Sequence, residues 1–110
     1  MRPLQLNRNG GIMTPSDTIQ SVALTTAAQA LDLPTGAQFG NFSANADFYL
    51  KSGSTGAAVP TTTSTAPSTS DSVSELNPTI RDFHSTQKTS GISVIAPVAG
   101  GMLTIGWFGP

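Results

Sequence analysis

The chain has 110 residues, which is enough for one domain and too few for a two-domain enzyme. Charged residues make up only 10% of it, against about 25% in typical soluble domains, and 15 Thr and 13 Ser supply much of the polar surface. Five Lys and Arg against six Asp and Glu give a net charge of −1. The chain therefore has no basic face for a run of phosphates, and we expect no nucleic-acid binding.

The chain contains no cysteine, which excludes a disulfide framework, a thiolate zinc site and a thiol nucleophile. No apolar stretch approaches the ~18–20 residues that span a bilayer. Residues 1–8 also lack the apolar centre of a secretion signal. We therefore expect no membrane partner.

Residues 1–20 show neither a period of 2 nor a period of 3.6, and they contain the Gly10-Gly11 pair and two prolines. This pattern predicts an extended amino-terminal arm. Leu4, Leu6 and Ile12 are apolar, and an arm that stayed solvated would have little use for them. The arm is therefore expected to lie on a neighbouring subunit; the alternative is a frayed terminus or a cloning remnant.

The domain that follows, residues 21–110, is predicted to be all-β. Short runs rich in Val, Ile, Thr, Phe and Tyr alternate there with Gly, Pro, Asn and Asp, which is typical of a sandwich or a barrel. The alanines between Val22 and Leu31 also permit a helix. Strands are predicted at 21–26, 28–32, 38–43, 47–52, 79–84, 91–96 and 103–107.

Two local features refine the third and fourth strands. Phe39 and Phe42 lie three residues apart, which breaks the alternation and predicts a bulge near Gly40. The turn residues at 45–47 predict that the third and fourth strands form a hairpin. Alternation puts Phe48 and Leu50 on one face of the fourth strand and Tyr49 and Lys51 on the other.

Residues 53–74 predict a long loop, because ten of the fifteen residues in 60–74 are Ser or Thr and no core can be built from them. A loop of this length inside a compact domain is usually functional or disordered. It is expected to be an exposed tip, a ribbon along a partner, or a solvated tether.

The last two strands carry the clearest signals. Residues 91–96 are apolar enough for a central strand that is buried on both faces. Leu103, Ile105 and Trp107 alternate with small residues, which predicts a buried strand at the end of the domain. The core is nevertheless small, with 23 large apolar or aromatic residues after residue 20, so part of the stability is expected to come from an assembly.

The residues that could support catalysis are few. His84 is the one histidine, and Asp82 lies on the same strand face, but no nucleophile elbow accompanies them. The six acidic residues are scattered, so neither a paired-carboxylate site nor a calcium site is predicted. Tyr49, Trp107 and the five Phe are expected to fill a core rather than to form a sugar-stacking platform. We expect no enzyme, no metal and no cofactor.

The order of turn and strand residues over 21–107 resembles small virion proteins of tailed bacteriophages, which are β-sandwich or jelly-roll modules. The runs that carry the resemblance are LPTGA at 33–37, ADFYL at 46–50, AAVP at 57–60, LNP at 76–78 and ISVIA at 92–96, before a Gly-rich turn and a terminal aromatic strand. The Ser/Thr-rich loop is longer than in such modules, and the arm has no counterpart in them.

The resemblance implies a single β-sandwich or jelly-roll domain of seven to eight strands with an extended arm. It further implies a capsid decoration (cement) protein that is made in the host cytoplasm, sits on the outer surface of the phage head and binds the major capsid protein. Such proteins are usually small homo-oligomers, and a trimer is favoured over a dimer. Leu4, Leu6, Arg8 and Ile12 are the predicted capsid or inter-subunit contacts, supplemented by backbone pairing along an exposed strand edge.

An alternative within the same virion is a tail, fibre or adsorption module. It would contact a receptor or a glycan through the Ser/Thr-rich loop and Tyr49. An enzyme would instead lose activity when His84 is replaced by alanine.

Overall fold

The structure, a computed structural model, describes residues 1–12, 14–53, 56–61, 66, 74–83 and 91–110. Within these residues all regular structure is β-strand, and none of them forms a helix that could cross a membrane. The helix that the alanines after Val22 permitted is absent, because β1 and β2 occupy that stretch. The strands are β1 (Thr18–Ala23), β2 (Gln29–Asp32), β3 (Phe39–Ala44), β4 (Tyr49–Ser52), β5 (Glu75–Leu76), β6 (Ile80–Asp82), β7 (Gly91–Ile95) and β8 (Met102–Phe108).

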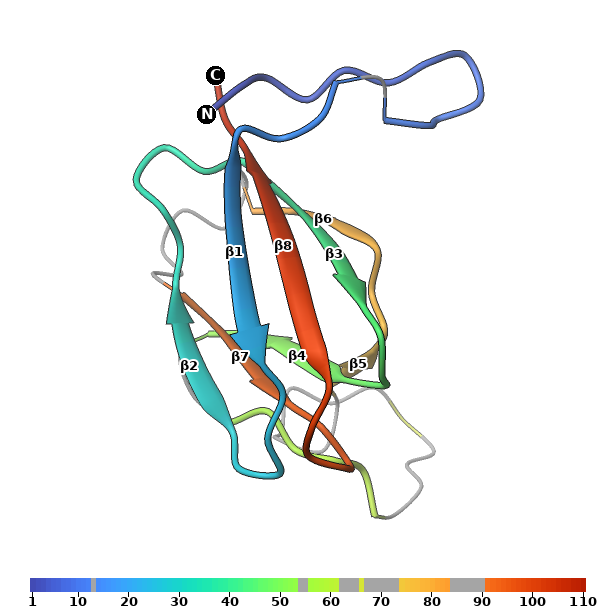
Figure 1. The fold of residues 1–110 in the computed structure, drawn as a ribbon, viewed down its shortest axis with the longest axis vertical. Helices are drawn as coiled ribbons and strands as arrows, with labels where there is room; N and C mark the ends of the chain where they lie inside the picture. The colour runs from blue at the N-terminus through green and yellow to red at the C-terminus, as the bar shows by residue number, and fades with distance from the viewer. Residues whose placement is uncertain (13, 54–55, 62–65, 67–73, 84–90) are drawn as a thin grey trace.

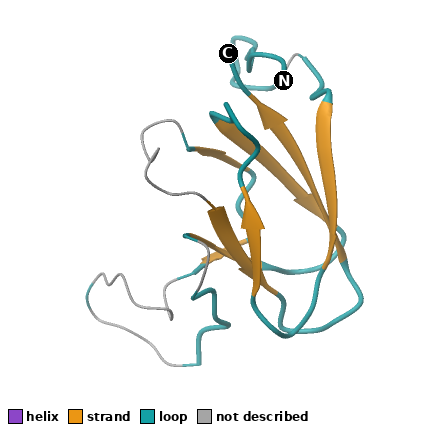
Figure 2. Cartoon of the chain, turned by 90° about the vertical axis from the view of Figure 1, so that its left-hand side faces the viewer, coloured by secondary structure: helices purple, strands orange, loops and turns teal. Residues whose placement is uncertain are grey.

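The strands form two antiparallel sheets of four, in the orders β1-β8-β3-β6 and β2-β7-β4-β5. Figures 1 and 2 show the two sheets facing each other as in a β-sandwich. The pairs are nested along the chain: β1 pairs with β8, β2 with β7, β3 with β6, and β4 with β5. Most connections therefore cross from one sheet to the other.

The strand boundaries differ from the predicted ones at two places. β1 begins at Thr18, so the end of the segment assigned to the arm belongs to the first sheet. β5 lies just after the Ser/Thr-rich segment and was not predicted, because two residues are too few to show a period. The prediction that residues 91–96 form a central strand is confirmed, since β7 lies between β2 and β4.

The predicted hairpin between the third and fourth strands is wrong. β3 belongs to the first sheet and β4 to the second, so the turn at residues 45–47 carries the chain across the sandwich. Phe42 and Phe48, on either side of this turn, meet in the core with ring centroids 6.4 Å apart. Alternation correctly placed Phe48 and Leu50 on the same face, and both are buried, but it does not identify the strand beside which β4 lies.

The predicted bulge near Gly40 is also absent. β3 pairs with β8 residue for residue from Phe39 to Ala44. Phe39 falls on the outer face, and Gly40 takes the inward position because Trp107, Phe42 and Phe83 fill the space above it. A Cβ atom on Gly40 would lie 3.0–3.1 Å from all three rings.

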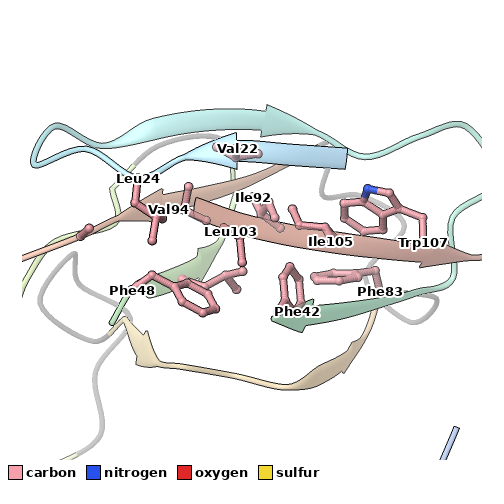
Figure 3. Close-up of a cluster of buried hydrophobic side chains, with 12 residues drawn as sticks. Val22, Leu24, Phe42, Phe48, Phe83, Ile92, Val94, Leu103, Ile105 and Trp107 are labelled. Atoms are coloured by element: carbon pink, nitrogen blue, oxygen red, sulfur yellow. The ribbon is translucent and has the colours of Figure 1, made fainter. Parts of the chain in front are cut away.

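The core lies between the sheets and draws on both of them (Figure 3). The first sheet supplies Leu103, Ile105 and Trp107 from β8, and the second supplies Ile92 and Val94 from β7; each of these five side chains is fully buried. Four aromatic rings pack against one another inside, with centroids 5.8–6.4 Å apart. The expectation that the aromatic residues fill a core rather than form a platform is confirmed for these four, whereas Phe39 and Tyr49 are half-buried outside the core cluster.

The outer face of the second sheet is partly covered by the chain itself. Ser93 lies between Ile92 and Val94 on β7, so its side chain points away from the core, yet it is fully buried. The backbone N–H of Ala57 donates to the Ser93 hydroxyl at 3.2 Å, and Ala57 is itself buried. The beginning of the predicted loop 53–74 therefore packs on its own sheet, while residues 54–55, 62–65 and 67–73 lie outside the described part of the chain.

Candidate interaction surface

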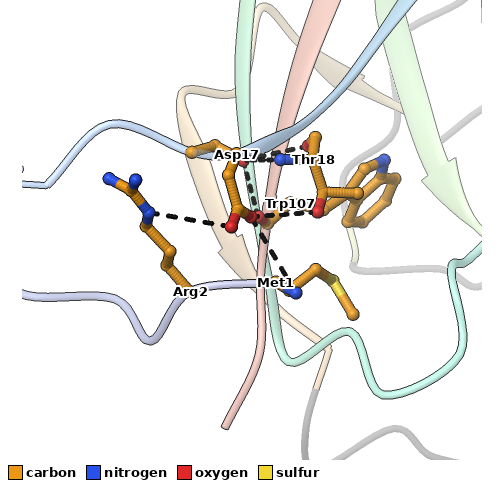
Figure 4. A network of polar contacts seen from close by, with 6 residues as sticks. Met1, Arg2, Asp17, Thr18 and Trp107 are labelled. Carbon is orange, nitrogen blue, oxygen red and sulfur yellow. Dashed lines mark hydrogen bonds and ion pairs between the residues drawn. The ribbon is translucent and has the colours of Figure 1, made fainter.

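The amino-terminal segment is attached to the sandwich beside the end of β8 (Figure 4). The Ser16 hydroxyl lies 2.7 Å from the carbonyl oxygen of Trp107 and accepts the backbone N–H of Thr18 at 3.1 Å. The Asp17 carboxylate lies 3.6 Å from Nε of Arg2. Both side chains of this ion pair are about half exposed, so water screens it and it contributes at most about 1 kcal/mol.

The first residues of the segment lie against the last residues of the chain. The backbone N–H of Gly109 donates to the carbonyl oxygen of Arg2 at 2.9 Å, and the side chain of Met1 packs against the edge of the core. Figure 1 accordingly shows the two chain ends side by side at one end of the sandwich. Residues 1–2 and 14–17 thus hold both ends of the intervening loop.

Between these attachments the chain folds back on itself instead of remaining extended. Leu6 and Ile12 form an isolated antiparallel bridge. Inside it, the N–H of Asn7 donates to the carbonyl of Gly11 at 2.8 Å, and the Asn7 side-chain oxygen accepts the N–H groups of Asn9 and Gly11 at 2.9 and 2.8 Å. We call residues 6–12 the amino-terminal loop. It projects beyond the sheets in Figure 1.

The predicted contact residues occupy different positions on this segment. Leu6 and Ile12 are 50% and 37% exposed and lie opposite each other across the bridge. Arg8 is exposed in the turn, whereas Leu4 is half-buried. The structure therefore brings two of the four residues together as an apolar pair, places the cation beside them, and leaves Leu4 less accessible than expected.

An open hollow of about 460 Å³ lies beside the crossing from β3 to β4. Three of its polar side chains, Asn45, Asp47 and Asn77, already have partners in the fold. Asn77 accepts the backbone N–H of Phe48 at 2.9 Å and donates to Asp47 at 2.8 Å, and Asn45 accepts the N–H of Met102 at 2.8 Å. These groups join turns to one another, so we assign the hollow a structural role.

The residues that the sequence marked as candidates for catalysis, metal binding or glycan contact contribute little to a site within the described part of the chain. His84 lies outside the described residues, and no group of three or more potential metal ligands occurs within them. Tyr49, expected to contact a glycan in the alternative function, is half-buried in β4 between β5 and β7.

Sequence reasoning missed a second exposed feature, the outer side of β1. Ile19 is 63% exposed there, and Ser21 and Ala23 are exposed as well. Ile19 had been assigned to the arm. The alternation that includes Val22 extends backwards to Gln20 and Thr18, and this was the signal for the strand. In the structure these two residues are more buried than their neighbours.

No family model, curated protein or solved structure matches the chain. On the described surface, the features that remain to explain function are an anchored loop closed by an apolar pair, Leu6 and Ile12, and the exposed, uncharged edge of β1.

Proposed function

We propose that the chain is a capsid decoration protein, a structural virion protein that binds the outside of a tailed-phage head and stabilises the shell through the major capsid protein. The observation that carries the proposal is the nested strand order, β1-β8-β3-β6 facing β2-β7-β4-β5. We interpret this order as an eight-stranded jelly roll. Jelly rolls are widespread in viral capsid proteins, lectins and cupins, and the resemblance of residues 21–107 to phage virion modules favours the first of these.

The surface chemistry supports a role in covering shell seams. A protein that acts by repetition over a symmetric shell can use weak, uncharged contacts, because many copies make them collectively strong. The chain has few charges.

The amino-terminal loop supplies the capsid contact in this proposal. Leu6 and Ile12 present an apolar pair on a loop whose backbone is fixed by internal hydrogen bonds. A pre-ordered loop loses little conformational entropy when it docks. Arg8 beside the pair would favour an acidic rim around an apolar recess on the capsid subunit.

The proposal is tested by co-sedimentation with expanded, undecorated heads assembled from the major capsid protein of the same genome. The wild-type chain is expected to saturate the heads and to raise their resistance to heat. The double substitution Leu6→Ser with Ile12→Ser removes apolar contact worth about 2 kcal/mol, which corresponds to a Kd roughly 30-fold higher per site.

Val98→Ser is the matched control. Val98 is 71% exposed in the turn between β7 and β8, at the end of the sandwich away from the amino-terminal loop (Figure 1). This variant should bind like the wild type. If the double variant binds heads as tightly as the wild type, the amino-terminal loop is not the capsid contact. If the wild-type chain does not bind heads and instead binds a host glycan or receptor, the adsorption module is supported.

A further inference from the structure

The two sheets have four edge strands, and three of them carry features that prevent pairing with another chain. Unpaired edges expose backbone N–H and C=O groups, and proteins protect them with short strands, charges, prolines or bulges. β5 has two residues and includes Glu75, β6 has three and includes Arg81 and Asp82, and β2 has four and ends at Asp32.

The fourth edge, β1, has none of these features. It is the longest of the four, with six residues, and Thr18–Ala23 contains no charge and no proline. It pairs with β8 residue for residue, so no bulge twists it away. Its outward side chains, Ile19, Ser21 and Ala23, are all exposed.

The backbone groups that face the free edge belong to the same three residues. Leu24 bonds across to Gly101 on the β8 side, so the backbone of Ala23 points the other way. The side-chain amide of Gln29 donates to the Ala23 carbonyl at 2.7 Å, which confirms this direction. Residues two apart on a strand share a direction, so the backbone groups of Ser21 and Ile19 also face outward.

We propose that β1 pairs with β1 of a second copy of this chain, antiparallel about a two-fold axis at Ser21. This register sets Ser21 opposite the partner's Ser21 and Ile19 opposite the partner's Ala23. The side-chain amide of Gln29 already donates to the Ala23 carbonyl, so it must swing aside or share that acceptor when the strands pair. The two four-stranded sheets then form one continuous sheet. The most exposed apolar side chain of β1, Ile19, then lies beside the partner's Ala23 on the same outer face.

The uncharged character of β1 favours a second copy over an unrelated strand. A two-fold axis places each strand against its own sequence, and a charge near the axis would face its own copy. The small side chains of Ser21 and Ala23 also allow the close approach of a second sheet. The resulting dimer differs from the trimer favoured by the resemblance, and it does not depend on the proposed role in the virion.

Cysteine cross-linking tests the register. The chain has no cysteine, so Ser21→Cys introduces a single thiol. In the proposed pair the two Cα atoms would lie about 5.5 Å apart, within the range that a disulfide spans. Ser43→Cys is the control, because Ser43 is exposed on β3 in the interior of the same sheet. Mild oxidation should convert most of S21C and little of S43C to a covalent dimer; equal yields, or none, would overturn the register.

Analytical ultracentrifugation tests the edge itself. The wild-type chain should dimerise below about 100 µM, with a thermal midpoint that rises with concentration. Ser21→Lys places a charge at the axis and should raise the dimer Kd at least about 10-fold, whereas Ser43→Lys should leave it unchanged. A wild-type monomer or trimer, or an S21K variant that dimerises normally, would refute the proposal. Should S21K fail to fold, the oxidation yields of S21C and S43C decide.

Discussion

At Gly40, three aromatic rings close over the backbone of β3. The position faces the core, where any other residue would place a Cβ within 3.0–3.1 Å of Trp107, Phe42 and Phe83. The rings are fixed by one another, since their centroids are 5.8–6.3 Å apart. Glycine is therefore required here by close approach, because φ at Gly40 is not positive.

Gly40→Ala should destabilise the fold. The gain from replacing a flexible glycine is about 0.5–1 kcal/mol, but overpacking a tight core costs about 1–3 kcal/mol. A net loss of about 1–2 kcal/mol is expected in the free energy of unfolding measured with urea. Ser43→Ala on the exposed face of the same strand should change it by less than about 0.5 kcal/mol. A stability of G40A equal to that of the wild type would show that the rings can move apart.

Asn77 combines an unusual backbone conformation with a full set of bonds. Its φ is 49°, the one positive value among the described residues that are not glycine. Its backbone N–H donates to the Phe48 carbonyl at 2.9 Å, while its side chain bonds to Phe48 and Asp47. One side chain thus joins the turn before β6 to the crossing that leads into β4.

Replacing Asn77 should separate the contribution of its side-chain hydrogen bonds from that of its positive φ. Asn77→Gly removes the side-chain bonds but accepts the positive φ, whereas Asn77→Ala removes the bonds and adds backbone strain of about 1–2 kcal/mol. N77A is therefore expected to be the less stable variant by about 1 kcal/mol in urea unfolding. Asp47→Ala, which removes only an exposed bond, should cost less than either. Equal stabilities of N77A and N77G would mean that the turn relaxes to a negative φ.

At the scale of the strands, the sequence correctly predicted which face of a strand is buried, but not which strand lies beside it. Alternation placed Leu103, Ile105 and Trp107 inward, and the apolar run at 91–96 located β7 at a sheet centre. It could not assign β3 and β4 to different sheets, because the same three-residue turn serves a hairpin and a crossing. The period shows which way a side chain points, while the identity of the neighbouring strand depends on contacts far along the chain.

The candidate contact surface on the amino-terminal loop was also predicted only in part. An apolar, Gly-containing segment without a period indicated that Leu6 and Ile12 would be accessible, and their exposure is observed. Their meeting across a bridge depends on four hydrogen bonds made by Asn7, which have no signature at the level of composition. The exposed edge of β1 was missed because Ile19 follows a Pro-containing segment that masked the beginning of the alternation.

At the scale of the whole molecule, the two sheets depend on one core. Trp107 is fully buried, contacts Phe42 and Phe83, and donates its indole N–H to Gln20 at 3.3 Å. Neither sheet has a second apolar layer of its own among the described residues. Loss of one sheet would therefore expose the core of the other.

Unfolding should consequently be a single transition. Trp107 is the only tryptophan, so its fluorescence reports on the shared core, while far-UV circular dichroism reports on both sheets. The midpoints of the two signals in urea are expected to coincide. Circular dichroism that persists after the fluorescence change would mean that one sheet remains folded alone.

The meeting of the two chain ends beside the amino-terminal loop gives the molecule a polarity. In a shell bound through that loop, a peptide or enzyme fused to either terminus would emerge close to the capsid and compete with docking. The turn that contains Val98 lies at the opposite pole. An epitope inserted there would face outward on every copy, which makes this turn the natural place to display a cargo.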